Sequence, residues 1–216
     1  MTYAQKIKAL LSPAERRVFE RLKTPEKIQN LLDSFPINFE LAGEEGAFGP
    51  RVVLRKRKAQ CMEGALFAAT ALAYHGHPPL LMDLKTPPYE DDHVVALFKR
   101  GGCWGAISKT NHPVLRWRDP LFKTPRDVAL SYFHEYFLSR TGEKTLRSYS
   151  RPFNLRFYSP ARFVTSEQDM GWLIDKLDAS PHLPIAPRKT LGQARRVSVL
   201  ERRASESTEW KVPRRR

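Results

Sequence analysis

The sequence lacks any run of about 18 uncharged apolar residues, which is the length needed to cross a bilayer. Its first ten residues, MTYAQKIKAL, also lack the apolar stretch of a secretory signal. We therefore expect a cytoplasmic protein with no membrane partner. Cysteine is scarce as well: Cys61 and Cys103 could form one disulfide at most, and a reducing compartment favours two free thiols.

Metal-binding spacings are missing too. No C-x-x-C or H-E-x-x-H pattern occurs, and the close pair His75 and His77 stands in a Gly- and Pro-containing turn. We expect no metal and no cofactor. Internal repeats are absent, and the only segment low in complexity is the basic tail from residue 186 onward.

Positive charge is abundant, at a net +14, but it is unevenly distributed. The segment 186–216 holds ten Lys or Arg and three Glu, which is half of the excess. Five further basic residues lie within 51–58, in RVVLRKRK. We predict a disordered tail at 186–216 that binds nucleic acid weakly and non-specifically, attached to a moderately basic folded part. The sequence leaves the oligomeric state open.

Several helix starts are legible as Ser or Thr caps, some followed by Pro and some by an acidic residue that completes a capping box. These signals predict helices over 13–22, 25–33, 125–138 and 166–178. A Gly- and Pro-containing segment after the second of them marks the edge of the main domain. We expect an N-terminal helical lead-in at 1–47, a main domain at 48–185, and the tail.

The segment AQCMEGALFAATALA is apolar around nearly its whole helical circumference, which predicts a buried central helix over 61–74. PLLMDL follows as a short buried strand. HVVALFKRGGCWGAIS then reads as two strands joined by a turn at Gly101 and Gly102. The pattern indicates an α+β fold in which this helix packs on an antiparallel sheet.

Cys61 heads the predicted central helix, where exposed backbone N–H groups and the helix dipole favour a thiolate. His93 opens the predicted strand HVVALF, so its ring could stand at a sheet edge and serve as the proton shuttle that a thiol nucleophile needs. The alternative is that Cys61 is an inert core residue, which is the commoner role of a cysteine in an apolar segment.

The run CMEGALFAATALAYHGHPPLLMDL, followed by DDHVVALF and GGCWGAIS, resembles the transglutaminase-like branch of the papain-like cysteine protease superfamily. TPEKIQNLLD and SYFHEYF are similar to segments of a bacterial subset of that superfamily. The resemblance covers about residues 50–120. It implies a papain-like α+β core and acyl transfer through a thioester on Cys61, with His93 as its partner and a peptide or amide as substrate.

One position departs from the family pattern. The residue four places after Trp104 is usually an Asp that orients the histidine, and here it is Ser108. In a hairpin that turns at Gly101–Gly102, Ser108 lies diagonal to His93, whereas one extra loop residue would bring Asn111 opposite it. We rank Asn111 first and Ser108 second. Asp91 and Asp92, which precede His93, are more typical of loop charges.

Three further residues near the proposed site are candidates for roles in it. Gln60 could supply an oxyanion donor beside the backbone N–H of Cys61, or it could be a solvated helix cap. Trp104 and Arg116 are candidate substrate-binding residues, since an Arg fork binds carboxylate or phosphate. The alternation LRWR at 115–118 favours the other interpretation, in which Arg116 lies on the outer side of a strand, because period-two alternation explains the pattern without further help.

Two functions remain in view. The first is a transglutaminase-like cysteine hydrolase or acyltransferase that acts on an amide or peptide carbonyl. The second is a catalytically inactive domain of the same fold that binds nucleic acid or an acidic partner through its basic surfaces, namely the 51–58 run and the tail. The missing Asp at position 108 is the main support for the second.

Overall fold

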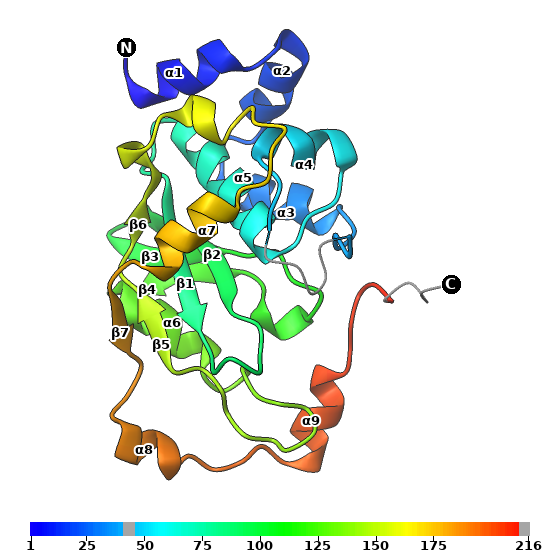
Figure 1. The fold of residues 1–216 in the computed structure, drawn as a ribbon, viewed down its shortest axis with the longest axis vertical. Coiled ribbons are helices and arrows are strands. Elements are labelled where there is room, and N and C mark those ends of the chain that lie inside the picture. Colours follow the sequence, from blue (N-terminus) through cyan, green and yellow to red (C-terminus); the bar gives the residue numbers. More distant parts are fainter. Residues whose placement is uncertain (41–45, 212–216) are drawn as a thin grey trace.

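The computed structural model describes residues 1–40 and 46–211 (Figure 1). Its first three helices are α1 (Tyr3–Leu10), α2 (Pro13–Arg21) and α3 (Pro25–Asp33). The predicted caps form: the Ser12 and Thr24 side chains accept backbone N–H bonds at the starts of α2 and α3. These two helices confirm the sequence prediction, and α1, which opens with its own capping box, was not predicted.

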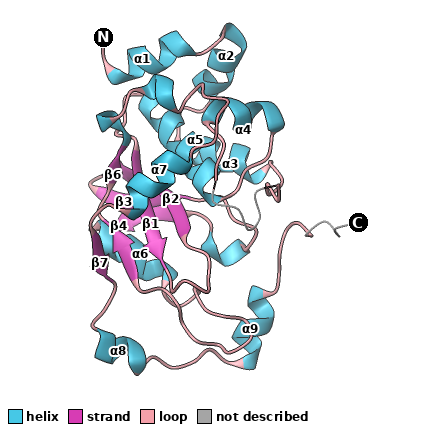
Figure 2. Ribbon diagram, viewed as in Figure 1, coloured by secondary structure: helices cyan, strands magenta, loops and turns pink. Residues whose placement is uncertain are grey.

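The buried central helix is also confirmed, as α5 (Cys61–Tyr74), in which every residue from Met62 onward is buried. The basic run before it forms a further helix, α4 (Pro50–Lys56). Arg57 then adopts a left-handed conformation (φ 54°), which ends α4. Figure 2 shows helices α1 to α5 gathered at one end of the molecule, with the strands beside them.

All strand pairs are antiparallel and form one seven-stranded sheet. The order is β4-β3-β2-β1-β5-β7, with β6 pairing with β1. The strands are β1 (Leu80–Lys85), β2 (His93–Arg100), β3 (Cys103–Ile107), β4 (Arg118–Phe122), β5 (Ser148–Ser150), β6 (Phe153–Asn154) and β7 (His182–Pro184). The α+β class and the antiparallel sheet agree with the prediction.

The hairpin between β2 and β3 turns at the expected glycines. Arg100 pairs with Cys103, and both residues between them have positive φ, 56° at Gly101 and 83° at Gly102. A two-residue turn of this kind requires φ > 0 at both central positions, which glycine adopts without steric cost. The turn therefore sets the register that brings the end of β3 beside the start of β2.

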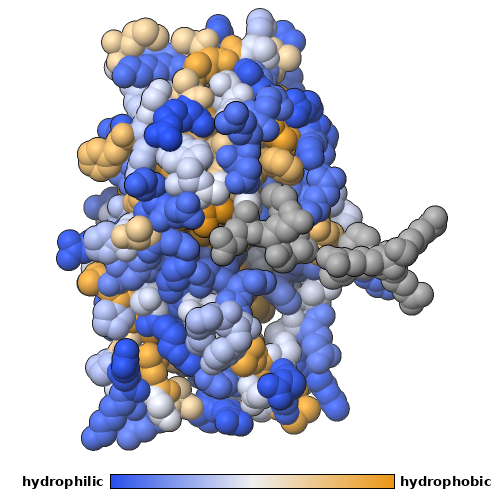
Figure 3. Space-filling model, in the orientation of Figure 1, coloured by the Kyte–Doolittle hydropathy of each residue, from blue (hydrophilic) through white to orange (hydrophobic). Residues whose placement is uncertain are grey.

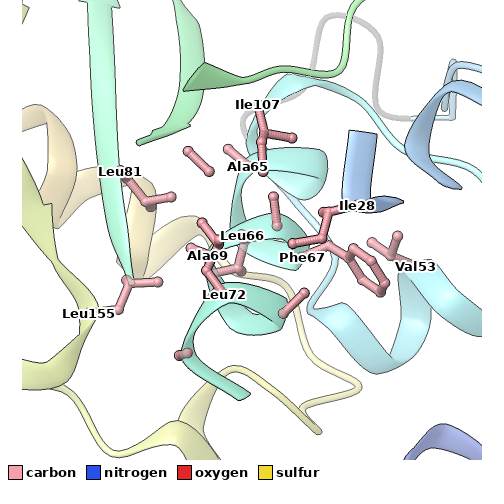
Figure 4. Close-up of a cluster of buried hydrophobic side chains, with 14 of the residues drawn as sticks. Ile28, Val53, Ala65, Leu66, Phe67, Ala69, Leu72, Leu81, Ile107 and Leu155 are labelled. Carbon is pink, nitrogen blue, oxygen red and sulfur yellow. The ribbon is translucent and has the colours of Figure 1, made fainter. Parts of the chain in front are cut away.

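Alternate residues of the strands divide the core into two layers. Leu81, Val94, Ala96 and Ile107 face α5 and the N-terminal helices, whereas their strand neighbours face the other side. In Figure 4 the α5 side chains Leu66, Ala69 and Leu72 lie near Leu81 and Leu155, and Phe67 lies near Ile28 and Val53. Residues of the lead-in, such as Ile28, therefore belong to the same core as the predicted main domain.

The opposite face of the sheet is covered by α6 (Pro125–Tyr132), whose Val128, Ala129 and Tyr132 are fully buried. This helix is shorter than the predicted 125–138. The Tyr136 carbonyl accepts the Thr145 N–H at 3.0 Å, so the chain after α6 pairs with a later segment instead of continuing the helix.

The predicted helix at 166–178 begins later, as α7 (Gly171–Asp178). The Asp169 carboxylate accepts the N–H groups of Ala47 at 2.8 Å and Gly171 at 2.5 Å. These contacts hold the segment before α7 against the loop that precedes α4. The described residues also form short 3-10 helices, namely η1 (Pro113–Leu115), η2 (Leu155–Phe157) and η3 (Pro160–Arg162).

The segment predicted to be a disordered tail contains two helices in its described part, α8 (Arg188–Gly192) and α9 (Val199–Ser205). Ser198 and Glu201 form a capping box at α9, a local signal that the basic composition obscured. None of the helices in residues 1–40 and 46–211 combines the length and the apolar run needed to span a bilayer. Polar side chains cover most of the face drawn in Figure 3, with apolar ones scattered among them.

Candidate active site

A cavity of about 400 Å³ opens where the amino end of α5 meets the first residues of β2. Cys61 and His93, the two residues that the sequence singled out, both line it. The rest of its wall comes from three segments, 90–92, 109–115 and 135–139, together with Ile37, Gln60 and Ser205. The structure therefore brings the predicted nucleophile and the predicted proton shuttle to one site.

Cys61 is the first residue of α5 and is half-buried. Its position follows from β2, because the Val94 N–H donates toward the sulfur together with the Met62 N–H. Burial nevertheless raises the pKa of the thiol to about 11, and the carboxylates of Asp83 and Glu63 act in the same direction. The expectation of a thiolate favoured by the helix end is corrected here: desolvation outweighs the two N–H donors.

His93 is almost fully buried at the start of β2, and its ring packs edge-on against Tyr132 of α6. Burial lowers the pKa of the imidazole to about 4, with the positive charge of Arg118 adding to the effect, although the nearby Leu115 carbonyl opposes it. At neutral pH the site therefore holds a neutral thiol and a neutral imidazole.

Ser108 is the hydrogen-bond partner of His93, at 2.7 Å from Nε2. The serine has one hydroxyl proton, which it donates to the Leu115 carbonyl at 3.0 Å. Ser108 Oγ must therefore accept from His93, which places the imidazole proton on Nε2 and leaves Nδ1 as the free lone pair. Among the described residues no hydrogen bond occupies Nδ1.

The main chain of Ser108 is itself held by α3. The Gln29 side chain accepts the Ser108 N–H at 3.0 Å and donates to the Ser108 carbonyl at 2.9 Å. Both residues are buried, so this pair of bonds fixes the serine against the helical layer. Gln29 lies in the N-terminal segment, which therefore supports the site directly, a role that no sequence signal indicated.

Asn111, ranked first as the residue that orients the histidine, lines the cavity but has another partner. Its side chain donates to the Trp210 carbonyl and accepts the Trp210 N–H, both at 2.8 Å. Asp92 is bound to Lys85 and to the Thr86 N–H, while Asp91 uses its carbonyl to accept from Tyr136. In the structure the serine, and none of these three, contacts the imidazole.

Gln60 is the N-cap residue of α5, and its side-chain amide donates to the Gly46 carbonyl at 2.9 Å. Its backbone N–H donates to Glu63, a buried carboxylate that also accepts from the Phe48 N–H and from Asn38. Glu63 thereby ties the Cys61 turn to the preceding loop. Its four hydrogen bonds, two of them from the Asn38 amide, explain how a fully buried carboxylate is tolerated two positions after Cys61.

The two candidate substrate-binding residues lie outside the cavity wall in the described part of the chain. Trp104 pairs with Lys99 near the hairpin turn, at the far end of β3. Arg116 forms an ion pair with Glu209 and a longer one, at 3.7 Å, with Asp33. Arg116 therefore links the loop after β3 to the C-terminal segment.

Two polar side chains of the wall were missed by sequence reasoning. Lys109 is almost fully buried, donates to the Phe35 carbonyl, and has its pKa lowered to about 8 by burial. Tyr136 lies within the span predicted as the helix 125–138, but its hydroxyl donates to the Asp91 carbonyl beside the cavity. The sequence carried no signal for either, since both depend on where α6 ends and how β3 continues.

Three carboxylates beside the site could be mistaken for a metal centre. Asp83, Asp92 and Asp178 bring their oxygens within 4.8 Å of one another. The ammonium group of Lys85 lies among them, 2.9 Å from Asp178 and 3.5 Å from Asp83. The lysine supplies the positive charge that the cluster needs, and we assign it a structural role.

No family model matches the chain, and no curated protein matches it in sequence.

Proposed function

We propose that this protein is a transglutaminase-like member of the papain-like superfamily that acts as a cysteine hydrolase or acyltransferase on an amide or peptide carbonyl. The observation that carries the proposal is the shared cavity of Cys61 and His93, in which Ser108 holds the imidazole with its Nδ1 lone pair free. A histidine with one nitrogen anchored and the other open, lining the same cavity as a thiol, suits general-base activation.

The neutral resting state suggests how the attack would proceed. The Cys61 sulfur bonds to the substrate carbonyl carbon while its proton passes to Nδ1 of His93, and Ser108 accepts from the imidazolium that forms. The same proton then goes to the departing amine as the carbon–nitrogen bond breaks, which leaves a thioester. Water or a second amine attacks the thioester and restores the thiol, releasing an acid or a new amide.

The amino end of α5 would support the developing oxyanion. The Cys61 backbone N–H is one of the helix donors without an intrahelical partner, and the Gln60 amide carries a second N–H besides the one given to Gly46. The Met62 N–H already donates toward the sulfur of Cys61, so these N–H donors lie around the atom that attacks the substrate.

The test is acyl-enzyme trapping. Glutaminyl peptides are incubated with the full chain, the reaction is quenched in acid, and intact mass together with ammonia release is measured. We expect an adduct in the unaltered protein and in Cys103→Ala, no adduct in Cys61→Ala, and an adduct that forms about 100-fold more slowly or worse in His93→Gln. Equal adduct formation in Cys61→Ala, or no adduct and no ammonia in any form, would refute the proposal.

A second candidate function, a binding domain without catalysis, is favoured by one observation: a thiol pKa near 11 beside an imidazole pKa near 4 is far from an activated pair. This alternative predicts affinity for single-stranded DNA that falls steeply with salt and is unchanged in Cys61→Ala. If the 186–216 segment is responsible, its removal abolishes most of that binding. Measured catalytic turnover, together with DNA binding that does not weaken as the salt concentration rises, would exclude this alternative.

A further inference from the structure

The basic run at 51–58 is largely paired with carboxylates in the fold. Arg51 pairs with Glu15 at 2.7 Å, and Arg55 pairs with Glu167 at 2.6 Å. Both lysines of the run, at positions 56 and 58, contact the carboxylate of Glu40. Five basic residues against three carboxylates leave the run with a charge of +2, so most of the net charge of +14 lies elsewhere.

A different set of cations, scattered along the sequence, meets in one hollow of about 690 Å³ between α1, α2, the start of α3 and the carboxyl end of α5. Figure 1 shows these helices at the end of the molecule that carries the N-terminus. Five of the residues that line the hollow are basic and one is acidic: Lys8, Arg17, Arg21, Lys23, Lys27 and Glu20. The hollow therefore has a net charge of +4.

None of the five cations forms an ion pair with a carboxylate in residues 1–40 and 46–211. All five are exposed, so their heads are available to a ligand. The single acid, Glu20, accepts from the Tyr74 hydroxyl at 3.4 Å. Lys8 lies 4.8 Å from the Tyr74 ring centroid, which is its one attractive contact with an aromatic group.

Like charges gathered in one hollow repel one another. The carboxyl ends of α1, α2 and α5 border this hollow, each with a partial charge of about −0.5, whereas the amino end of α3 contributes about +0.5. These helix ends together offset about one of the four excess positive charges. The remaining charge is a cost to the folded chain that a bound polyanion would remove.

We propose that this hollow binds a compact ligand that carries several phosphate groups. Arginine forks and lysine ammonium groups around a concave surface match clustered phosphate oxygens, and the two arginines can each bind in a bidentate manner. The two aromatic rings among the described residues of the hollow are poorly placed to stack on a base: Tyr74 is buried, and the half-buried His75 packs edge-on against it and bonds to the Phe19 carbonyl at 2.8 Å. Recognition therefore rests on the phosphates and not on a nucleobase.

This site is distinct from the proposed active site. It lies at the carboxyl end of α5, whereas Cys61 is the first residue of the same 14-residue helix. A helix of that length separates its two ends by about 20 Å. Loss of catalysis in Cys61→Ala therefore leaves this proposal untouched, and the two can fail separately.

The test is titration calorimetry of the full chain with inorganic tripolyphosphate, with orthophosphate and a 20-nucleotide oligo(dT) as comparison ligands. The double variant Arg17→Gln/Lys27→Gln removes two cations of the hollow from exposed helix positions. Lys123→Gln/Lys176→Gln makes the same change in net charge at exposed positions elsewhere. We expect tripolyphosphate affinity to fall about tenfold or more in the first and to stay unchanged in the second.

Glu20→Gln supplies a test of opposite sign, because it removes the one carboxylate that lines the hollow among the described residues and should strengthen tripolyphosphate binding. Orthophosphate should bind far more weakly than tripolyphosphate. The proposal is overturned if the unaltered chain does not bind tripolyphosphate, if both double variants weaken binding equally, or if oligo(dT) binds the hollow much more tightly than tripolyphosphate does. The last result would assign the site to a nucleic-acid backbone.

Discussion

The buried imidazole of His93 should make the protein sensitive to acid in a defined pH range. In the folded chain the pKa of His93 is about 4, against 6.5 for an unperturbed histidine. As pH falls below about 6.5 the unfolded chain therefore takes up a proton that the folded chain excludes. Stability is intact above that pH and is lost progressively down to about pH 4.

The size of the effect follows from the two pKa values. At pH 5 the unfolded histidine is almost fully protonated and the folded one almost fully neutral. This difference in proton binding raises the unfolding equilibrium constant by a factor of about 30. This factor corresponds to about 2 kcal/mol of unfolding free energy, and the full effect below pH 4 is about 3 kcal/mol. The cause is burial of the imidazole, which disfavours its charged form, and the positive charge of Arg118 adds to the effect.

Urea unfolding at pH 7 and pH 5 measures this contribution. Between pH 7 and pH 5 the unfolding free energy of His93→Gln should fall by about 2 kcal/mol less than that of the unaltered chain, whatever the stability of the variant at pH 7. His77→Gln, which removes an exposed histidine from the turn after α5, is the control and should leave the pH dependence unchanged. If His93→Gln loses as much stability as the unaltered chain, the buried neutral imidazole is refuted.

Two further predictions concern the support of the site. Gly64→Ala would place a Cβ 2.4 Å from Lys109 Cβ. We expect thermal or urea unfolding to show that this change lowers the unfolding free energy by about 1–3 kcal/mol. Gly192→Ala is the control, because its Cβ meets no atom within 4 Å, and it should be neutral or slightly stabilising. Ser108→Ala removes the acceptor of the imidazole N–H but keeps the Cys61 nucleophile. We expect acyl-enzyme formation to be about tenfold slower or worse in this variant. An unchanged rate would show that another group orients His93.

Local signals in the sequence were sufficient for several elements of the fold. The Ser12 and Thr24 caps start α2 and α3, and the glycine pair at 101–102 sets the β2–β3 hairpin. These features depend on a few consecutive residues, whose backbone preferences are the same in any surroundings. Elements that depend on distant contacts were placed less well: α7 begins at Gly171 because Asp169 binds Ala47.

The candidate site divides in the same way. The sequence by itself determined that a cysteine would head a buried helix and that a histidine would open a neighbouring strand, since helical and strand periodicities are local patterns. Only the tertiary structure decided the partner of His93, which is Ser108 because Gln29 of a distant helix holds its main chain. It also decided the charge state of the pair, because the pKa of Cys61 depends on how completely the fold excludes water from the sulfur.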